Sequence, residues 1–144
     1  MSNHYHLMLS PLVNGGISKL LQKVGTSYTK YFDIKYERSG RLFESTFKAK
    51  HVDSGEYASY LTQYIHLNPG DIFRGSTSDP REGFKKVLGY VWSSLPDYVG
   101  QKSNVSHLLS GTFRERILDV SADQYLSFAE ELYLLDKEQS TTEA

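Results

Sequence analysis

The stretch from which we predict the fold is Tyr57-Ala-Ser-Tyr-Leu-Thr-Gln-Tyr-Ile-His-Leu-Asn-Pro69. It has no Gly or Pro before Pro69, and its apolar side chains predict one buried helix face: Ala58, Leu61, Ile65 and Leu67. Asp53 or Ser54 can cap the start of the helix. Proline cannot continue the hydrogen-bond ladder and restricts the residue before it, so the helix should end near Asn68.

Two polar side chains share one face near the end of this helix. Tyr64 and Asn68 lie four residues apart, or about 40° of rotation, so a phenol and a carboxamide lie side by side. His66 follows Tyr64 by two residues, about 200° around the helix, and therefore points away from it. Taken alone, the pattern also fits a core or boundary tyrosine ahead of a common Asn-Pro helix stop.

Composition favours one compact domain in a reducing compartment. The chain has 144 residues, of which 39% are hydrophobic, and this is enough for a core of its own. It has no cysteine, which excludes disulfides and thiolate metal sites and favours the cytoplasm. No apolar run approaches the roughly 20 residues that span a bilayer, so we expect no membrane partner.

The net charge of −1 conceals an asymmetry between the two parts of the chain. Residues 1–50 carry eight Lys and Arg against three Asp and Glu, a balance of +5. Residues 51–144 carry eight against fourteen, a balance of −6. This distribution indicates a surface for a polyanion in the first part, although a solvated helix face also explains much of it.

A histidine pair lies near the start of the chain. Residues 1–10 alternate like a strand, and Pro11 with the turn at residues 14–16 closes it. Alternation places His4 and His6 on one face, where two imidazoles can chelate one divalent metal ion. A half-exposed histidine pair without metal is the alternative, and a metal site needs a further donor from elsewhere.

The basic part of the chain is predicted to hold a long helix and a second strand. Residues 16–36 repeat apolar side chains every three or four positions, while residues 41–52 alternate after a turn at residues 37–40. Tyr28 and Tyr31 can stack on bases, with core packing as their alternative role. The candidate DNA-binding side chains are Lys19, Lys23, Lys30, Arg38, Arg41, Lys48 and Lys50.

The remainder of the chain is predicted to be helical after a mobile connection. Gly, Ser, Pro and charged residues dominate residues 70–86, and short turns or a short helix follow over residues 88–100. Helices are expected at residues 103–110 and 121–135, and a disordered tail at residues 137–144. One face of the last helix is predicted to be marked by Tyr125, Phe128, Leu132 and Leu135.

Six sequence pieces in a fixed order support a family resemblance. They are Asn3-His4-Tyr5-His6-Leu7-Met8-Leu9, Gly25-Thr-Ser-Tyr-Thr-Lys-Tyr-Phe, Ser39-Gly-Arg-Leu-Phe, Phe47-Lys-Ala, Tyr64-Ile-His-Leu-Asn-Pro and Tyr90-Val-Trp-Ser-Ser-Leu-Pro-Asp-Tyr. Together they resemble the single-tyrosine HUH transposases, and within these the REP-associated tyrosine transposases. Each piece alone is loose, but the ordered set from Asn3 to about Gly100 is specific.

The resemblance implies an α+β fold with a ferredoxin-like palm, an antiparallel sheet with helices on one face. Family members carry further elements before the histidine strand, so it implies a palm that is incomplete at its N-terminus. The corresponding domains are a palm with the tyrosine helix at residues 1–69, a linker with a helical C-terminal extension at 70–136, and the tail at 137–144.

The resemblance also assigns the site. His4 and His6 correspond to the family's ligands for Mg²⁺ or Mn²⁺, and Tyr64 corresponds to its nucleophile. Asn68 occupies the place of the third, amide-bearing ligand. His66 competes for that role but is less favoured, because it lies on the other side of the helix from Tyr64.

The implied function is a DNA transposase and HUH endonuclease that cuts and rejoins single-stranded DNA through a 5′-phosphotyrosine intermediate, without a nucleotide cofactor. Its implied partner is single-stranded or hairpin DNA in the bacterial cytoplasm or nucleoid, bound by a monomer or by a homodimer, which includes a domain-swapped one. One alternative is a transposase-derived protein that binds hairpin DNA but no longer cuts it. Another is a helical structural protein with an incidental His-x-His pair.

Overall fold

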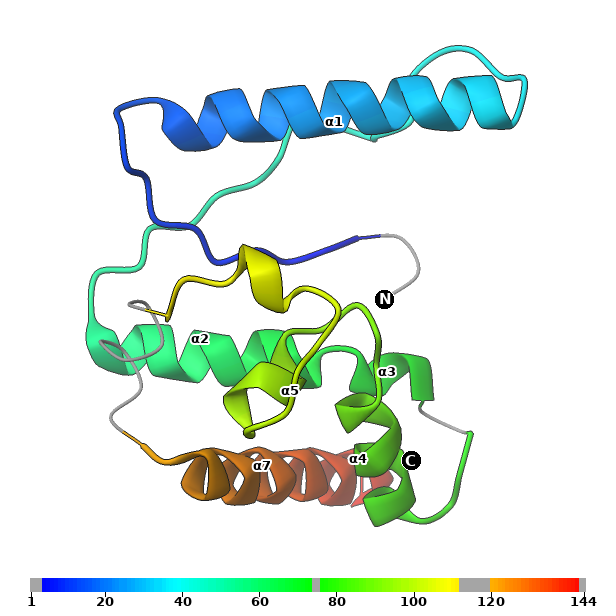
Figure 1. Ribbon diagram of the computed structural model, residues 1–144. Helices are drawn as coiled ribbons and strands as arrows, with labels where there is room; N and C mark the ends of the chain where they lie inside the picture. The colour runs from blue at the N-terminus through cyan, green and yellow to red at the C-terminus, as the bar shows by residue number, and fades with distance from the viewer. Residues whose placement is uncertain (1–3, 74–75, 112–119, 143–144) are drawn as a thin grey trace. The chain divides into compact units, whose positions relative to one another are not determined.

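The computed structural model describes residues 4–73, 76–111 and 120–142, and they fold into helices joined by irregular segments. In chain order the helices are α1 (Gly16–Lys35), α2 (Gly55–Leu67), α3 (Gly70–Phe73), α4 (Pro80–Leu88), α5 (Leu95–Tyr98), a 3₁₀ turn η1 (Ser106–Leu108) and α7 (Ala122–Thr142) (Figure 1). The chain divides into two units. The α1 unit is Leu7–His51, and the α2–α7 unit joins the residues up to His6 to Val52–Ala144.

The predicted α+β fold with its ferredoxin-like sheet is wrong. The structure is 56% helix, and the described residues include no strand. The first expected strand was residues 1–10, of which residues 1–3 lie outside the described part of the chain. Residues 4–10, and the second expected strand at residues 41–52, belong to no helix or strand. Alternation specifies which side chains share a face, but a strand also needs a neighbouring chain to pair its N–H and C=O groups. In residues 43–51 every side chain is exposed, so neither alternating face is buried.

Helix α1 confirms the prediction for residues 16–36, and its ends follow from local sequence. Gly15 precedes it in the left-handed region, with φ of 71°, where glycine meets no steric penalty. After Tyr36 the chain turns at Glu37 and Gly40, both with positive φ. No residue of α1 is buried, so its apolar side chains form no core of their own.

Helix α2 begins and ends where the sequence predicts. Ser54 is the N-cap, and its hydroxyl accepts a hydrogen bond from the Tyr57 N–H at 3.2 Å. Asn68 is the C-cap. The predicted buried face is only partly right, because the fully buried side chains are those of Ala58, Thr62 and His66. The predicted Leu61, Ile65 and Leu67 are half-buried beside that stripe.

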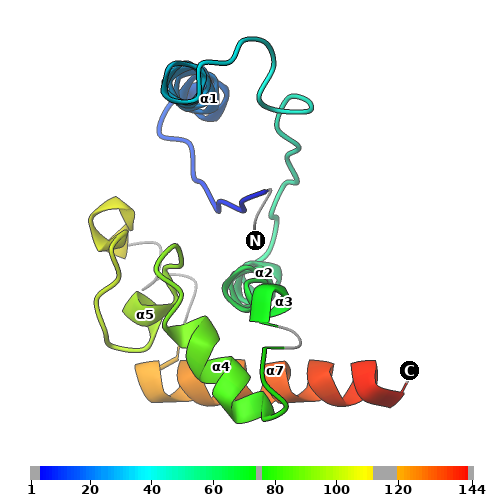
Figure 2. The same cartoon turned by 90° about the vertical axis from the view of Figure 1, so that its right-hand side faces the viewer.

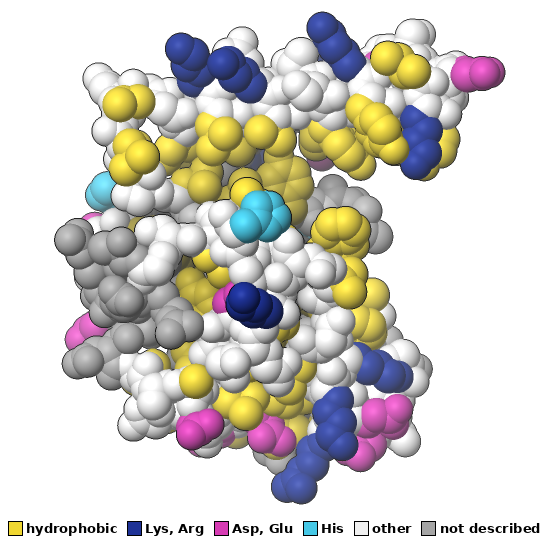
Figure 3. Space-filling view, in the orientation of Figure 1, with side chains coloured by type: hydrophobic (Ala, Val, Ile, Leu, Met, Phe, Trp, Pro, Cys, Tyr) yellow, Lys and Arg dark blue, Asp and Glu magenta, His cyan; other side chains and the backbone are white. Residues whose placement is uncertain are grey.

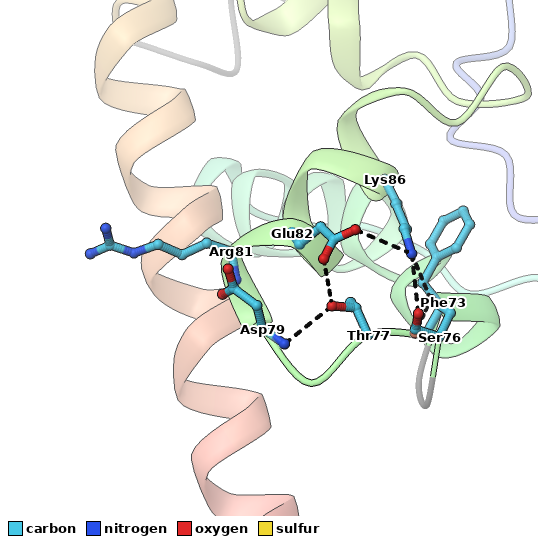
Figure 4. Close-up of polar contacts among 7 residues, drawn as sticks. All are labelled: Phe73, Ser76, Thr77, Asp79, Arg81, Glu82 and Lys86. Carbon is cyan, nitrogen blue, oxygen red and sulfur yellow. Dashed lines mark hydrogen bonds and ion pairs between the residues drawn. The ribbon is translucent and has the colours of Figure 1, made fainter.

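The predicted mobile connection at residues 70–86 instead contains two helices, α3 and most of α4. Asp79 caps α4 by accepting a hydrogen bond from the Arg81 N–H at 2.9 Å, and Pro80 occupies the first turn. Figure 4 shows the preceding loop held to this helix: the Thr77 hydroxyl donates to Glu82 at 2.8 Å, and Lys86 reaches Ser76. Asp and Pro are common in turns but equally favoured at helix starts, so composition alone misled the prediction.

The core of the α2–α7 unit forms where α4, α5 and α7 meet. Its buried members are Phe84, Val87, Leu95, Tyr98, Tyr125, Ala129 and Tyr133. Helix α7 contacts α2, α4 and α5, and in Figure 2 it runs across below α2, which is seen end on.

Helix α7 extends the predicted helix at residues 121–135, but it buries a different stripe. Tyr125, Ala129 and Tyr133 are buried at a spacing of four, whereas Phe128 and the two predicted leucines that follow it are exposed. Ala129 is fully buried in this stripe, although its small side chain stands out little in the apolar periodicity of the sequence.

Three smaller observations complete the comparison with the sequence. Helix α5 is a short helix within residues 88–100, as predicted, whereas residues 103–110 form only the η1 turn. The predicted domain boundary at residue 69 falls inside the α2–α7 unit. Of the tail predicted to be disordered, residues 137–142 belong to α7, and residues 143 and 144 lie outside the described part of the chain. In the part of the chain that the structure describes, no helix combines the length and apolar character needed to cross a bilayer.

Candidate active site

The α2–α7 unit brings together three of the predicted site residues, His4, His6 and Tyr64. The ring centroids of His4 and His6 lie 5.3 Å apart with an interplanar angle of 87°. The His6 ring lies 5.9 Å from the Tyr64 ring, at 67°. Two imidazoles and one phenol therefore form a contiguous cluster from two distant parts of the sequence.

Tyr64 is accessible because α2 buries the opposite side of the helix. Its side chain is 47% exposed, while His66, two residues on, is 2% exposed. Residues two apart on a helix point about 200° from each other, so burying the Ala58–Thr62–His66 stripe turns Tyr64 outward. The phenol is thus open to a large substrate on one side and bordered by the His6 imidazole on the other.

The electrostatics of the pair favour a neutral His6. Partial burial lowers the pKa of His6 below its ordinary value of 6.5, and the nearby His4 lowers it further. A neutral imidazole has the free lone pair that a metal ion requires.

Asn68 lies one turn beyond Tyr64, at the C-cap of α2. Its backbone is helical, with φ of −53° and ψ of −34°, and its N–H donates to the Tyr64 carbonyl at 3.0 Å. The helix therefore does not unwind before this residue, and its half-buried carboxamide stays on the Tyr64 side of α2.

His66 is engaged in the interior instead. Its Nδ1 lies 2.7 Å from the Tyr125 hydroxyl of α7, and its Nε2 lies 2.8 Å from the hydroxyl of Ser94, the N-cap of α5. A neutral imidazole has one donor and one acceptor nitrogen, so one hydroxyl donates to the ring and the other accepts from it. Both nitrogens are thus occupied by protein partners, which leaves neither for a metal ion.

Burial controls the protonation of this interior group. It lowers the pKa of His66 from 6.5 to about 3, opposed in part by the Asp97 carboxylate. It also raises the pKa of the Tyr125 hydroxyl above its ordinary value. Both groups therefore stay neutral at physiological pH.

The partners of His66 were not identified from the sequence. Tyr125 was placed on the buried face of the last helix, but as an apolar marker and not as a hydrogen-bonding group. Ser94 lies in residues 88–100, for which the sequence predicts short turns or a short helix but no hydrogen-bonding role. The sequence held one signal for such partners: His66 lies on the side of its helix opposite Tyr64. If that side is buried, the imidazole requires polar partners.

The seven predicted DNA-binding side chains all belong to the α1 unit. Six of them are exposed, and Figure 3 shows Lys and Arg side chains projecting from α1. Arg38 is half-buried, because it pairs with Asp33 at 3.2 Å and donates to the Arg41 carbonyl at 3.0 Å. Lys23 lines a shallow hollow with three polar neighbours, Gln22, Thr26 and Ser27.

The aromatic side chains of the α1 unit gather around Tyr28. Its ring lies 6.5 Å from Tyr31, 6.2 Å from Phe32 and 6.2 Å from Phe43. Tyr28 and Tyr31 are each about half exposed, at 49% and 55%. These rings therefore keep accessible faces beside the lysines.

Among the described residues, no group of three or more His, Cys, Asp and Glu side chains is arranged to hold a metal ion. The predicted ligand set, two histidines and one asparagine amide, has only two side chains of these four types and so differs from such a group. Comparisons of the chain with protein-family models, with curated proteins and with solved structures found no match.

Proposed function

We propose that this protein is a metal-dependent, single-tyrosine transesterase that cuts and rejoins single-stranded DNA at hairpin-flanked sites, as a DNA transposase does. The observation that carries the proposal is the contact between Tyr64 and the His4–His6 pair. An accessible phenol beside two imidazoles combines a nucleophile with nitrogens of the kind that bind metal ions, and this cluster contains three of the four residues that the family resemblance assigns.

The covalent step is a phosphoryl transfer to Tyr64. The phenol loses its proton and its oxygen attacks a backbone phosphate, so that a bond forms between the tyrosine oxygen and phosphorus. The bond between phosphorus and the 3′ oxygen breaks, and that oxygen takes up a proton and leaves as a free 3′-OH. Attack by another 3′-OH reverses these changes and rejoins the DNA. Since the energy of the phosphodiester is kept in the phosphotyrosine, no nucleotide cofactor is consumed.

The residues around Tyr64 have distinct roles in this proposal. His4, His6 and Asn68 would hold a divalent ion, Mg²⁺ or Mn²⁺, a choice that suits nitrogen and oxygen donors without thiolates. When bound, the ion would supply positive charge to the scissile phosphate and favour the ionised phenol, because phenols are poor nucleophiles at neutral pH. Helix α2 fixes the phenol and the carboxamide on one side, so that both face the same phosphate.

The α1 unit supplies the proposed grip on DNA. It contains all eight Lys and Arg of residues 1–50 against three Asp and Glu. Lysines contact phosphates without regard to sequence, and half-exposed tyrosines offer faces on which unpaired bases can stack.

A second candidate function is a transposase-derived protein that binds hairpin or single-stranded DNA without cutting it. The observation that favours it is the lack of a sheet in the described residues, because the family resemblance places the histidine pair on a central strand. In the structure the described part of the segment that carries His4 and His6 belongs to no strand.

One assay separates the two functions. The purified protein is incubated with Mn²⁺ and labelled single-stranded hairpin DNA from the flanks of its own gene, and denaturing gels are scored for a covalent protein–DNA band. The enzyme predicts a band that requires metal and is lost in Tyr64→Phe. DNA binding in a mobility shift, without any band in the wild-type protein, would support the non-cutting protein instead.

A further inference from the structure

Helix α2 buries a stripe of small and polar side chains. Ala58, Thr62 and His66 are between 2% and 5% exposed, and they follow one another at a spacing of four. Ala58 has a single methyl group, and the Thr62 hydroxyl donates to the Ala58 carbonyl of its own helix at 2.7 Å. Both side chains are small and by themselves constrain the rotation of α2 little, although the half-buried Leu67 beside this stripe also packs against the core.

His66 is the large side chain of this stripe, and it is fixed from two directions. Its two nitrogens bond to hydroxyls on α7 and at the start of α5, at 2.7 and 2.8 Å. Its ring also meets Tyr98 edge to face, with centroids 4.6 Å apart. Buried hydrogen bonds have narrow angular tolerance, so two on opposite sides of one ring fix the rotation of the helix that carries it.

That rotation decides where Tyr64 points. Since Tyr64 lies about 200° around α2 from His66, a roll of the helix that moves the imidazole also moves the phenol, in the opposite direction. The phenol contacts His6, which comes from a segment without regular structure, so α2 provides the rigid side of that contact.

We infer that His66 is a positioning residue, which through its hydrogen bonds to Tyr125 and Ser94 holds the Tyr64 phenol against the His4–His6 pair. The role in catalysis rests on the proposed function, whereas the role in geometry does not. This inference gives a role to His66, which the sequence analysis treated as a competing metal ligand. It also extends the site to Tyr125 of α7 and to Ser94, the N-cap of α5.

The test uses single-atom changes that keep the shape of the interior. Tyr125→Phe removes the hydroxyl at Nδ1, and Ser94→Ala removes the hydroxyl at Nε2. Val87→Ala serves as the matched control, since Val87 is fully buried in the same core and its truncation destabilises the fold without removing either hydrogen-bond partner of His66. All four proteins are compared at a temperature at which circular dichroism shows each of them folded.

The first readout needs neither DNA nor metal. Nuclear Overhauser contacts between the ring protons of Tyr64 and His6 are measured in each protein. We expect them to weaken in Tyr125→Phe and Ser94→Ala and to persist in Val87→Ala. Unchanged contacts in both hydroxyl variants, or an equal loss in Val87→Ala, would overturn the inference.

The second readout is the single-turnover rate constant for the covalent band. We expect each hydroxyl variant to lower it about tenfold with the Kd for hairpin DNA unchanged within about twofold, since a misplaced nucleophile slows chemistry more than binding. Val87→Ala should retain the wild-type rate constant. A parallel loss of rate in all three variants would indicate a merely structural role. If wild-type protein forms no band, the proposed function fails, and the ring contacts still decide the positioning role.

Discussion

The rings of His6 and Tyr64 lie with centroids 5.9 Å apart, at an angle of 67°. One belongs to an irregular segment near the start of the chain, and the other belongs to the exposed face of α2. Nothing in the local sequence of either segment requires this contact, so it depends on tertiary structure. It joins the proposed nucleophile to the proposed metal ligands and underlies the predictions below.

Removing one imidazole tests whether the pair takes part in the reaction. We predict that His6→Ala lowers the rate of covalent band formation by more than the roughly 10- to 100-fold that changes beyond the metal's direct ligands cost. His107→Ala is the control, because His107 is exposed on the η1 turn. A His6→Ala protein that is as fast as the control would remove the histidines from the mechanism.

Acid should destabilise the protein through His66. The pKa of His66 is about 3 in the folded state and 6.5 in the unfolded state. Between these values the imidazole is protonated in the unfolded chain and neutral in the folded chain. The stability is therefore complete above pH 6.5 and declines as the pH falls toward 3, by about 2 kcal/mol between pH 7.5 and pH 5.

Urea unfolding at those two pH values measures this loss. In His66→Gln the largest part of the dependence should disappear, because glutamine does not titrate. The smaller contribution of His6, whose pKa is also lowered, has the same sign and remains in the variant. An equal pH dependence in both proteins would show that His66 is protonated in the folded state.

The close approach of α4 to α7 predicts a sensitive glycine. A Cβ added at Gly83 would lie 2.5 Å from the Tyr133 hydroxyl, and that ring is only 5% exposed. We predict that Gly83→Ala lowers the free energy of unfolding by about 1–3 kcal/mol, despite the better helix propensity of alanine. Gly55→Ala, which meets nothing within 4 Å, should change it by less than about 0.5 kcal/mol. Equal stability of the two variants in urea would contradict this packing.

The α1 unit should determine the salt dependence of DNA binding. Each phosphate contact to a single strand contributes about 0.7 to the slope of log K against log salt. Replacing Lys19, Lys23 and Lys30 by alanine should therefore lower the slope by about 2. The matched control replaces three basic residues of the α2–α7 unit, Arg81, Lys85 and Lys102, which are also exposed. If the slope falls as much in the control variant as in the α1 variant, the DNA surface is not in the α1 unit.

Elements with local signals were predictable from the sequence. Helix α2 starts after a Ser54 cap and ends at Leu67, with Asn68 before Pro69 as its C-cap, and α1 lies between glycine-containing turns. Each of these signals acts within one helical turn, so no knowledge of the rest of the chain was needed. The same locality explains why Tyr64 and Asn68 share one side of a helix in the structure.

The prediction of a sheet failed because a strand forms only where another segment of the chain pairs with it. The alternation around His4 and along residues 41–52 describes faces, but pairing depends on where another segment lies. The interior role of His66 was also hidden, because its partners Ser94 and Tyr125 come from α5 and α7 and their hydroxyls carry no periodic signal.

The most direct test of the central claim is to locate the covalent bond. Wild-type protein incubated with Mn²⁺ and hairpin DNA is digested with nuclease and protease, and the peptides are analysed by mass spectrometry. The proposal predicts a nucleotide mass linked through a 5′ phosphate to Tyr64, and no such peptide from Tyr64→Phe. Tyr60→Phe, one turn earlier and 60% exposed, should retain it. A nucleotide on another residue, or no nucleotide on any peptide of a protein that binds the DNA, would contradict the proposed mechanism.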